Sequence, residues 1–478
     1  MSRRTSPDSR TQWRGWIPVV AVVIAALSGV SLALLYWSPV AGALMGPRAP
    51  QREPGMAETT RDGVYYVSPG GNDTDGTSWG HAWKTVSRIK WDRVQPGATI
   101  YLDGGAGGVT YTSSLVVGSS GTPSAPITIR VSPDRNHNGP VRIFGGRTTP
   151  LPYCGQTGYR LQSDGLRANG IVFDNASHVI VDGGRWHGLV IYGHDGDGVL
   201  FNGGESDVTL RNAEVYDNGT VEIGSDGRAS SDAAGIRPRG RHLVFDQVDV
   251  HDNGQDALQS GGPLNDIAIL HSWLHIVREN PLLPAGSAFN TPCTHQDGLQ
   301  IYGGGNQSGV TIRDSVLGPG LMEGLMLGDS GANVSSVTVS NSLVINGAHN
   351  GLIGYSGQTQ NYWTVDHTTV FMNSQQDALS WVGNDSRVTT SIFYGGGFYL
   401  PHGLAVSEGN CLWQNGDDSY LVKGQVADPR FRTDVGGFGP SPSLATQAGA
   451  DFALQEVTPC PGAGSSITST GMLVATAK

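Results

Sequence analysis

The stretch Gln296-Asp297-Gly298-Leu299-Gln300 decides the fold, because close copies of it recur along the chain. Two of these copies, Gln255-Asp256-Ala257-Leu258-Gln259 and Gln376-Asp377-Ala378-Leu379-Ser380, are nearly identical to it. From Asp297 the same position recurs after 26, 27, 27 and 25 residues, at Glu323, Asn350, Asp377 and His402. A fixed period of this length is typical of stacked units, each of them one supersecondary element.

Short runs of β-branched residues lie between these copies, as in Val208–Asn212, Val310–Asp314 and Val337–Asn341. β-branched residues that alternate with polar ones suit a half-buried strand, and Asn-Gly or Asp-Gly pairs supply the turns. Gly accounts for 70 of the 478 residues, which a tight bend in every coil explains. A unit of about 25 residues without a helical pattern favours an all-β, single-stranded, right-handed parallel β-helix solenoid.

Two steps are longer than the period: 37 residues from Asp197 to Ala234 and 41 residues from Asp256 to Asp297. The additional residues fall in Gly219–Ser231 and Arg278–Thr294. Long loops inserted into regular coils are usually functional or disordered. We therefore expect these two loops to form the walls of a groove.

Two further motifs frame the repeats. The opening segment Val64–Asp73 is followed by Gln95–Leu102, and the close is formed by Asp428–Phe431 and Asp451–Gln455. With these motifs, residues 64–464 resemble the right-handed parallel β-helix proteins of the pectate lyase type. The resemblance implies the fold but no single activity, because lyases, hydrolases, epimerases and non-enzymatic surface proteins share it.

The N-terminal residues carry a membrane signal. Ile17–Tyr36 is an uncharged apolar run of 20 residues, preceded by four Arg residues and followed by no Lys or Arg before Arg48. That length can cross a bilayer, and the charge bias places the N-terminus in the cytoplasm. The alternative is a cleaved signal peptide. Both interpretations export the β-helix, and the first predicts a single-pass protein of the cell membrane.

The predicted organisation has five segments. They are a basic tail (1–15), a transmembrane signal-anchor (16–37), a Pro/Gly/Ala-rich tether (38–62), the β-helix (63–430) and a C-terminal closing segment with a tail (431–478). His81–Arg93 is predicted to be a short helix that caps the first coil. In an exported chain, the four cysteines permit three disulfide pairings, with free buried thiols as the alternative. One pairing would join Cys411 to Cys460, tying the C-terminal closure to the last coil, and Cys154 to Cys293, holding the long loop to the body.

The net charge is −11, which argues against nucleic acid as a partner. It also disfavours a bare polyanion, unless calcium or an Arg cluster screens the charge. A polysaccharide is the partner that we expect, in addition to the membrane.

The predicted catalytic residues are carboxylates on consecutive coils. Strands of neighbouring coils lie about 4.8 Å apart, so outward-facing Asp256 and Asp297 would have carboxyl groups about 5 Å apart, with Glu323 one coil further. Retaining glycosidases need about 5 Å between carboxylates, and inverting ones about 6.5–9.5 Å. Asp256 and Asp297 would equally suit Ca²⁺ as an alternative.

Polar residues accompany these carboxylates. Arg237, Gln259 and Gln300 occupy one column on consecutive coils, which together with Arg239 predicts a strip that binds sugar. His295 lies two residues before Asp297 and is a natural proton carrier. The competing interpretation is turn chemistry, in which each Asp bonds nearby backbone N–H groups.

The reaction is constrained by what the repeats lack. The chain has four lysines, Lys84, Lys90, Lys423 and Lys478, and none lies in the repeats. This argues against a Lys base and slightly favours hydrolysis over elimination. Three alternatives stay open: a calcium-dependent lyase with Arg237 as base, a C5 epimerase, and a non-catalytic glycan-binding scaffold.

Overall fold

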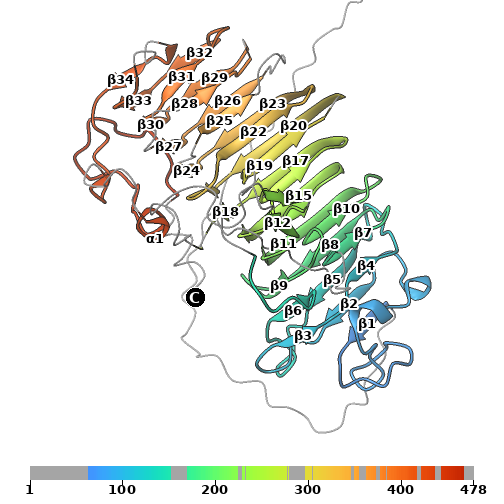
Figure 1. Ribbon diagram of the computed structural model, residues 1–478. Coiled ribbons are helices and arrows are strands. Elements are labelled where there is room, and N and C mark those ends of the chain that lie inside the picture. The colour runs from blue at the N-terminus through green and yellow to red at the C-terminus, as the bar shows by residue number, and fades with distance from the viewer. Residues whose placement is uncertain are drawn as a thin grey trace, which may run out of the picture. The chain divides into compact units, whose positions relative to one another are not determined.

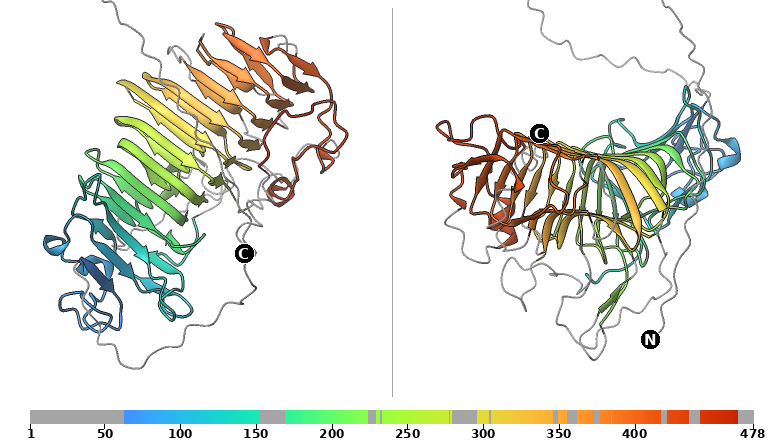
Figure 2. Two further views of the ribbon diagram at one scale, coloured as in Figure 1. Left: turned by 180° about the vertical axis from the view of Figure 1, so that it is seen from behind. Right: turned by 90° about the horizontal axis from the view of Figure 1, so that it is seen from above.

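The computed structural model describes residues 63–151, 169–223, 229–231, 233–276, 278, 296–303, 305–345, 349–354, 362–372, 377–383, 385–416, 421–435 and 443–467. Within these ranges the chain is almost entirely β-strand, and the strands stack coil upon coil (Figure 1). Neighbouring coils pair in parallel along the stack (Figure 2). The predicted parallel β-helix is therefore confirmed.

Each regular coil contributes three strands. The first belongs to a ten-stranded sheet, and the other two form a first column and a second column of a 22-stranded sheet. The ten-stranded sheet contains β4 (Leu115–Val117), β7 (Ile171–Phe173), β10 (Val199–Phe201), β14 (Ile236–Arg237), β16 (Leu258–Ser260), β19 (Leu299–Tyr302), β22 (Glu323–Asp329), β25 (Asn350–Gly354), β28 (Asp377–Ser380) and β31 (Gly397–Tyr399).

The 22-stranded sheet takes its two columns from successive segments of each coil. The first column contains β1 (Val64–Val67), β2 (Thr99–Leu102), β5 (Ile127–Val131), β8 (Val179–Asp182), the first halves of β11 (Ser206–Tyr216) and β15 (Gly240–His251), β17 (Leu264–Leu270), β20 (Gly305–Arg313), β23 (Ala332–Ser340), β26 (Trp363–Asp366), β29 (Arg387–Thr389) and β32 (Val406–Glu408). The second column contains β3 (Val109–Tyr111), β6 (Val141–Phe144), β9 (Leu189–Tyr192), the second halves of β11 and β15, β18 (Trp273–His275), β21 (Val316–Leu317), β24 (Leu343–Ile345), β27 (Thr369–Phe371), β30 (Ile392–Tyr394), β33 (Asn410–Trp413) and β34 (Gly424–Val426).

The repeat fixes the register of the ten-stranded sheet. Leu258 pairs with Leu299, Leu299 with Leu325, and Leu352 with Leu379. These leucines are buried in the core, whereas the residue after each of them faces outward. A slip of one residue would exchange the two faces, so the apolar pattern specifies the pairing strongly.

The last predicted repeat is wrong. Asp377 pairs with Gly397 rather than with His402, so the final strand of this sheet is β31. Phe398 of β31 is buried and packs its ring edge-on against Phe393. Leu404, in the predicted position, is only partly buried. The larger apolar side chain occupies the core, and the coil is shorter than the period.

Side-chain ladders hold the corners of the coils. Asn218 donates from its backbone N–H and from Nδ2 to Asn253 Oδ1, at 3.1 Å each. Between the first and second columns, Ser272, Ser315 and Ser342 accept a backbone N–H from the preceding coil. The ladders satisfy polar groups that the corners bury.

The first of the long loops is partly described. β12 (Val221–Ile223) pairs in an antiparallel hairpin with β13 (Ala229–Ser231), inside the predicted insertion. The second loop, apart from Arg278, lies outside the described residues. The backbone N–H of Arg278 donates to Asp252 Oδ1 at 3.1 Å, which anchors the start of this loop next to β15.

The predicted cap helix is wrong in form. Only two single 3₁₀ turns occur, η1 (Val86–Arg88) and η2 (Trp91–Arg93). Trp83 makes a parallel β-bridge with Val67, and Lys90 has a non-helical backbone between the turns. A continuous helix over 81–93 is therefore impossible. The segment nevertheless packs Trp83, Val86 and Ile89 into the core.

The C-terminal segment covers part of the second column. Phe431, Phe452 and Cys460 pack with Phe371 and Tyr394, which project outward from that column. The short helix α1 (Leu444–Ala448) is capped by Ser443, whose hydroxyl accepts the Thr446 N–H at 3.0 Å. The segment thereby closes a face that the coils alone would leave apolar and exposed.

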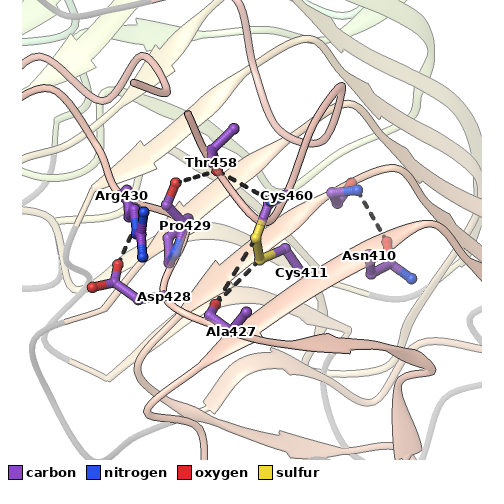
Figure 3. The surroundings of a disulfide bond; sticks show 9 residues. Asn410, Cys411, Ala427, Asp428, Pro429, Arg430, Thr458 and Cys460 are labelled. Atoms are coloured by element: carbon purple, nitrogen blue, oxygen red, sulfur yellow. Dashed lines mark hydrogen bonds between the residues drawn. A yellow bond between two sulfur atoms is a disulfide. The ribbon is translucent and has the colours of Figure 1, made fainter. Parts of the chain in front are cut away.

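The predicted disulfide Cys411–Cys460 is present and ties this segment to β33 (Figure 3). Beside it, Thr458 Oγ1 donates to Pro429 O and accepts the Cys460 N–H. The other predicted pair, Cys154–Cys293, lies outside the described residues. Among the residues that the structure describes, no helix has the length and hydrophobicity needed to span a membrane. The predicted span at residues 16–37 lies outside them.

Candidate functional site

The carboxylate column of the ten-stranded sheet contains two kinds of residue. Asp197, Asp256 and Asp297 each accept the backbone N–H of the equivalent residue on the next coil. The three distances are 2.9, 2.7 and 3.1 Å in that order. All three side chains are buried. They therefore bond one coil to the next through N–H groups that are 26–41 residues away in the sequence, instead of the local N–H groups expected of turn chemistry.

The residues beside this column form one hydrogen-bonded row. Arg237 Nε lies 2.9 Å from Asp197 Oδ2, and Arg237 Nη1 donates to Gln259 Oε1 at 2.9 Å. Gln259 Nε2 in turn donates to Gln300 Oε1 at 3.0 Å. The structure therefore brings together the predicted Arg237, Gln259 and Gln300, on the outward side of the sheet. Their exposed fractions are 6–8%.

Glu323 differs from the aspartates. Its side chain is 5% exposed, and Oε1 lies 3.3 Å from His349 Nδ1. Oε2 is buried, and no hydrogen-bond partner for it is found within the described part of the chain. A buried carboxylate oxygen without a partner is costly and needs an explanation. His349 is half-exposed, so this pair reaches from the buried column to the surface.

The outward row changes character at Glu323. Arg237, Gln259 and Gln300 precede it, and Met326, Ile353, Ser380 and Tyr399 follow in register. Gln300 Nε2 lies 3.5 Å from Met326 Sδ, where the polar part meets the apolar part. Tyr399 is 45% exposed and contacts Trp381 at 4.6 Å between ring centroids. A polar strip that leads to the exposed Tyr399 and the half-buried Trp381 suits a sugar, which has both polar edges and apolar faces.

The remaining predictions for this sheet have different outcomes. Arg239 lies in the turn between β14 and β15, with its stem against Gly262. His295 lies outside the described residues. The calcium alternative at Asp256 and Asp297 stays a prediction. A cation there would compete with Gln259 Nε2, which donates to Asp256 Oδ2 at 2.8 Å.

A second polar cluster lies on the outward side of the second column. His187, Glu214 and Asp249 each offer one ligand atom, and these atoms all lie within 4.8 Å of one another. His187 precedes β9, and the carboxylates are neighbours on β11 and β15. Behind them, His275 Nε2 lies 2.9 Å from Asp249 Oδ1, and His251 Nε2 lies 3.3 Å from Glu214 Oε1.

Burial and charge act against each other in this cluster. Burial opposes ionisation of Asp249, but nearby His275 and the hydrogen bond from His187 hold its pKa well below the usual range. Burial also disfavours the charged form of His251, but bonds to Asp252 and Glu214 raise its pKa to about 10. Asp252 has its pKa lowered to about 2, against burial, by the hydrogen bond with His251.

Aromatic rings extend from this cluster along the same column. Phe144, Tyr192, Tyr216 and His251 occupy consecutive coils in register. Tyr216 and His251 are parallel, with centroids 5.1 Å apart and an interplanar angle of 1°. The stack runs along the helix axis and buries part of each ring.

Sequence reasoning missed His349 and the His187 cluster for different reasons. His349 stands directly before the Asn350 repeat position, in the column of Gln255 and Gln296, so reading that neighbouring column would have found it. Glu214 and Asp249 both stand two residues before an aligned bend residue, Tyr216 or His251, which is a usable signal. No sequence signal places His187 beside them, because 62 residues separate it from Asp249.

Comparison with known proteins gives structural similarity only. No protein-family model and no curated protein sequence matches the chain. A pectate lyase, Pel9A, superposes with a TM-score of 0.45 and 15% identity over 84% of this chain and 91% of that one. A rhamnogalacturonan lyase superposes with a TM-score of 0.44 and 10% identity over 86% of this chain and 98% of that one. An alginate lyase from Paenibacillus sp. superposes with a TM-score of 0.40 and 16% identity over 68% of this chain and 97% of that one. These scores carry no argument about activity, and the fold rests on the strand pairing described above.

Proposed function

We propose that the protein is a carbohydrate-active enzyme that cleaves a polysaccharide along the outward row of the ten-stranded sheet. The observation that carries this proposal is the Glu323–His349 pair, with one buried carboxylate oxygen that lacks a hydrogen-bond partner. Glu323 stands where the outward row changes from the polar Gln300 to the apolar Met326.

Hydrolysis is the reaction that we favour, slightly, over elimination. The bond between the anomeric carbon and the glycosidic oxygen breaks, and a proton passes to that oxygen. Water adds its oxygen to the anomeric carbon and gives up a proton. Glu323 and His349 lie 3.3 Å apart, closer than two groups that flank a sugar as separate acid and base. His349, as the more exposed group and with its ring held by Glu323, is therefore proposed to donate the first proton to the leaving oxygen and then to accept the proton of the incoming water.

An alternative is a calcium-dependent lyase with Arg237 as the base. An Arg base has to give up its proton, and Asp197 stabilises the protonated guanidinium from 2.9 Å. The ion pair therefore disfavours the deprotonated form of Arg237 that a catalytic base requires. Arg237, Gln259 and Gln300 are instead proposed to bind substrate hydroxyl groups.

The activity test uses the full-length protein in detergent micelles, with a panel of neutral and uronate-containing polysaccharides, with and without calcium. New reducing ends without absorbance from an unsaturated uronate indicate hydrolysis, and that absorbance indicates elimination. Glu323→Gln and His349→Gln are each expected to lower turnover about 10²-fold or more. Asp377→Asn in the same column, and His367→Gln at an exposed His, are the matched controls.

Two results would reject the proposal. If Glu323→Gln retains wild-type turnover on a cleaved glycan, this pair is not the catalytic site. An Asp256→Asn/Asp297→Asn variant that is folded but inactive would then return the site to those residues. If the wild-type protein binds a glycan and forms no product, it is a glycan-binding scaffold and not an enzyme.

We also propose that the β-helix is exported and held at the cell membrane by residues 16–37. The disulfide Cys411–Cys460 supports an oxidising compartment. Protease added to intact cells should degrade the β-helix while a label at the N-terminus stays protected. Release of the whole β-helix into the medium would instead indicate cleavage of a signal peptide.

A further inference from the structure

We propose that His187, Glu214 and Asp249 bind one divalent transition-metal ion on the outward side of the second column. The three ligand atoms lie within 4.8 Å of one another, and His187 Nε2 is 2.9 Å from Asp249 Oδ2. Two donors that are each about 2.1 Å from a zinc ion lie roughly 3–4 Å apart. The cluster therefore needs only small side-chain shifts to surround an ion.

The two carboxylates are oriented for this role from behind. Asp249 directs Oδ1 to His275 and Oδ2 to His187. Glu214 has Oε1 3.3 Å from His251 and Oε2 3.8 Å from His187 Nδ1, the ring nitrogen that Asp249 does not contact. Each carboxylate thus uses one oxygen for a supporting histidine and has the other near the His187 ring, one nitrogen of which would bind the ion. Groups that orient ligands in this way usually contribute strongly to metal affinity.

The site is open to solvent on one side. The exposed fractions of the three side chains are 35% for His187, 21% for Glu214 and 7% for Asp249. An ion held by them would have three protein ligands and at least one position open to water or a ligand. One imidazole with two carboxylates suits zinc, and the imidazole makes Ca²⁺ and Mg²⁺ poorer candidates.

This site is separate from the proposed catalytic pair, because it lies on the other sheet. It neither supports nor requires glycan cleavage. A useful comparison is His242, which contacts Asp207 at 3.3 Å and Asp266 at 3.2 Å through its two different ring nitrogens. His187 also meets its two carboxylates through different ring nitrogens. His242 is 53% exposed, however, and among the described residues it belongs to no group of three ligand atoms close enough to hold an ion.

The test is metal binding by the full-length protein in detergent micelles, prepared without a histidine tag and stripped with a chelator. Zinc titrated by calorimetry is expected to bind at one ion per chain, more tightly than calcium. Cobalt(II) should give a ligand-field spectrum of nitrogen and oxygen ligation. His187→Gln and Glu214→Gln should each weaken zinc binding at least ten-fold, whereas His242→Gln should leave it unchanged.

Circular dichroism in the presence of chelator establishes that each variant is folded. The proposal is overturned if the folded His187→Gln/Glu214→Gln double variant binds zinc as the wild type does. It is equally overturned if the wild type binds no zinc, or binds calcium more tightly. Loss of zinc binding with glycan cleavage retained would leave the proposed function intact.

Discussion

The outward side of the second column has two halves with opposite chemistry. On β11 and β15 it presents the charged residues Glu214, Asp249 and His251, with Glu214 in contact with His251. From β21 onward it presents apolar side chains such as Leu343 and Phe371, packed under the C-terminal segment. Trp273 marks the boundary, because it stacks on His275 at 3.7 Å and belongs to the apolar cluster. The backbone is the same in both halves, so what covers the column decides which residues it can carry.

The largest effect should come from the apolar half. Phe371 is 1% exposed and contacts the rings of Tyr394 and Phe452 at 5.1 Å. Phe371→Ala leaves a cavity between coil and segment, at an expected cost of about 3–5 kcal/mol. The urea midpoint of the full-length protein measures this. Val426→Ala, at a 72% exposed side chain, is the control. An equal loss of stability in both variants would mean that the cover over Phe371 contributes nothing.

Removing the disulfide should have the next largest effect. Cys411 and Cys460 are 49 residues apart in sequence, so Cys411→Ala/Cys460→Ala frees a long loop in the unfolded state, at about 2–4 kcal/mol. Hydrogen exchange should rise first at β30 and β33. If protection falls equally at β9 and β11, then the C-terminal segment does not act on its own half alone.

In the polar half, an added apolar side chain should lower the stability of the fold. His275→Leu, which would suit the apolar half, leaves Asp249 Oδ1 without its 2.9 Å partner. The expected cost is about 1–3 kcal/mol in chelator-treated protein. Leu343→Met is the matched control in the apolar half and should cost less. A His275→Leu variant as stable as wild type would make the two halves equivalent.

Acid should have a smaller effect, which distinguishes a buried carboxylate of the neighbouring first column, Asp182 on β8, from the apolar half. Burial raises the pKa of Asp182, but hydrogen bonds from Asn212, the Gly184 N–H and Arg211 outweigh it, so the pKa is lowered overall. A lowered pKa stabilises the fold above the unfolded value of about 3.9, and this stability is lost as pH falls through the folded value. Asp182→Asn should cost on the order of 1 kcal/mol at pH 7.

Urea midpoints of the wild type and of Asp182→Asn, compared from pH 7 downward, check this expectation. The two curves should converge below about pH 4. A constant difference at every pH would mean that the charge of Asp182 contributes nothing. Phe371→Ala should show the opposite behaviour, with a loss that hardly changes over the same range.

The coil register was predictable because each error in it has a physical cost. Had the pairing of Leu258 with Leu299 slipped by one residue, Gln259 and Gln300 would enter the core. The last coil was not predictable in the same way. Gly397-Phe398-Tyr399 lacks the Asp-Gly-Leu pattern, and only the packing of Phe398 against Phe393 selects it.

The candidate site was predictable only in its outline. Sequence placed Arg237, Gln259, Gln300 and Glu323 on neighbouring coils, and the structure has them there. It could not tell whether Asp256 faces a groove or accepts the Asp297 N–H, because both choices keep the same repeat. The length of the side chain distinguishes Glu323 from these aspartates, and its contact with His349 depends on the neighbouring coil.

The C-terminal tail has a consequence for how the solenoid unfolds. Stacked repeats contact only their neighbours, so the end coils of such proteins tend to fray one by one. Here the Ser465 N–H donates to Thr369 Oγ1 at 3.0 Å, and the Ser466 N–H donates to Asn341 Oδ1 at 2.8 Å. Cys460 holds the same tail at β33. Because one tail contacts coils from β24 to β33, we expect these coils to open together instead of fraying one by one.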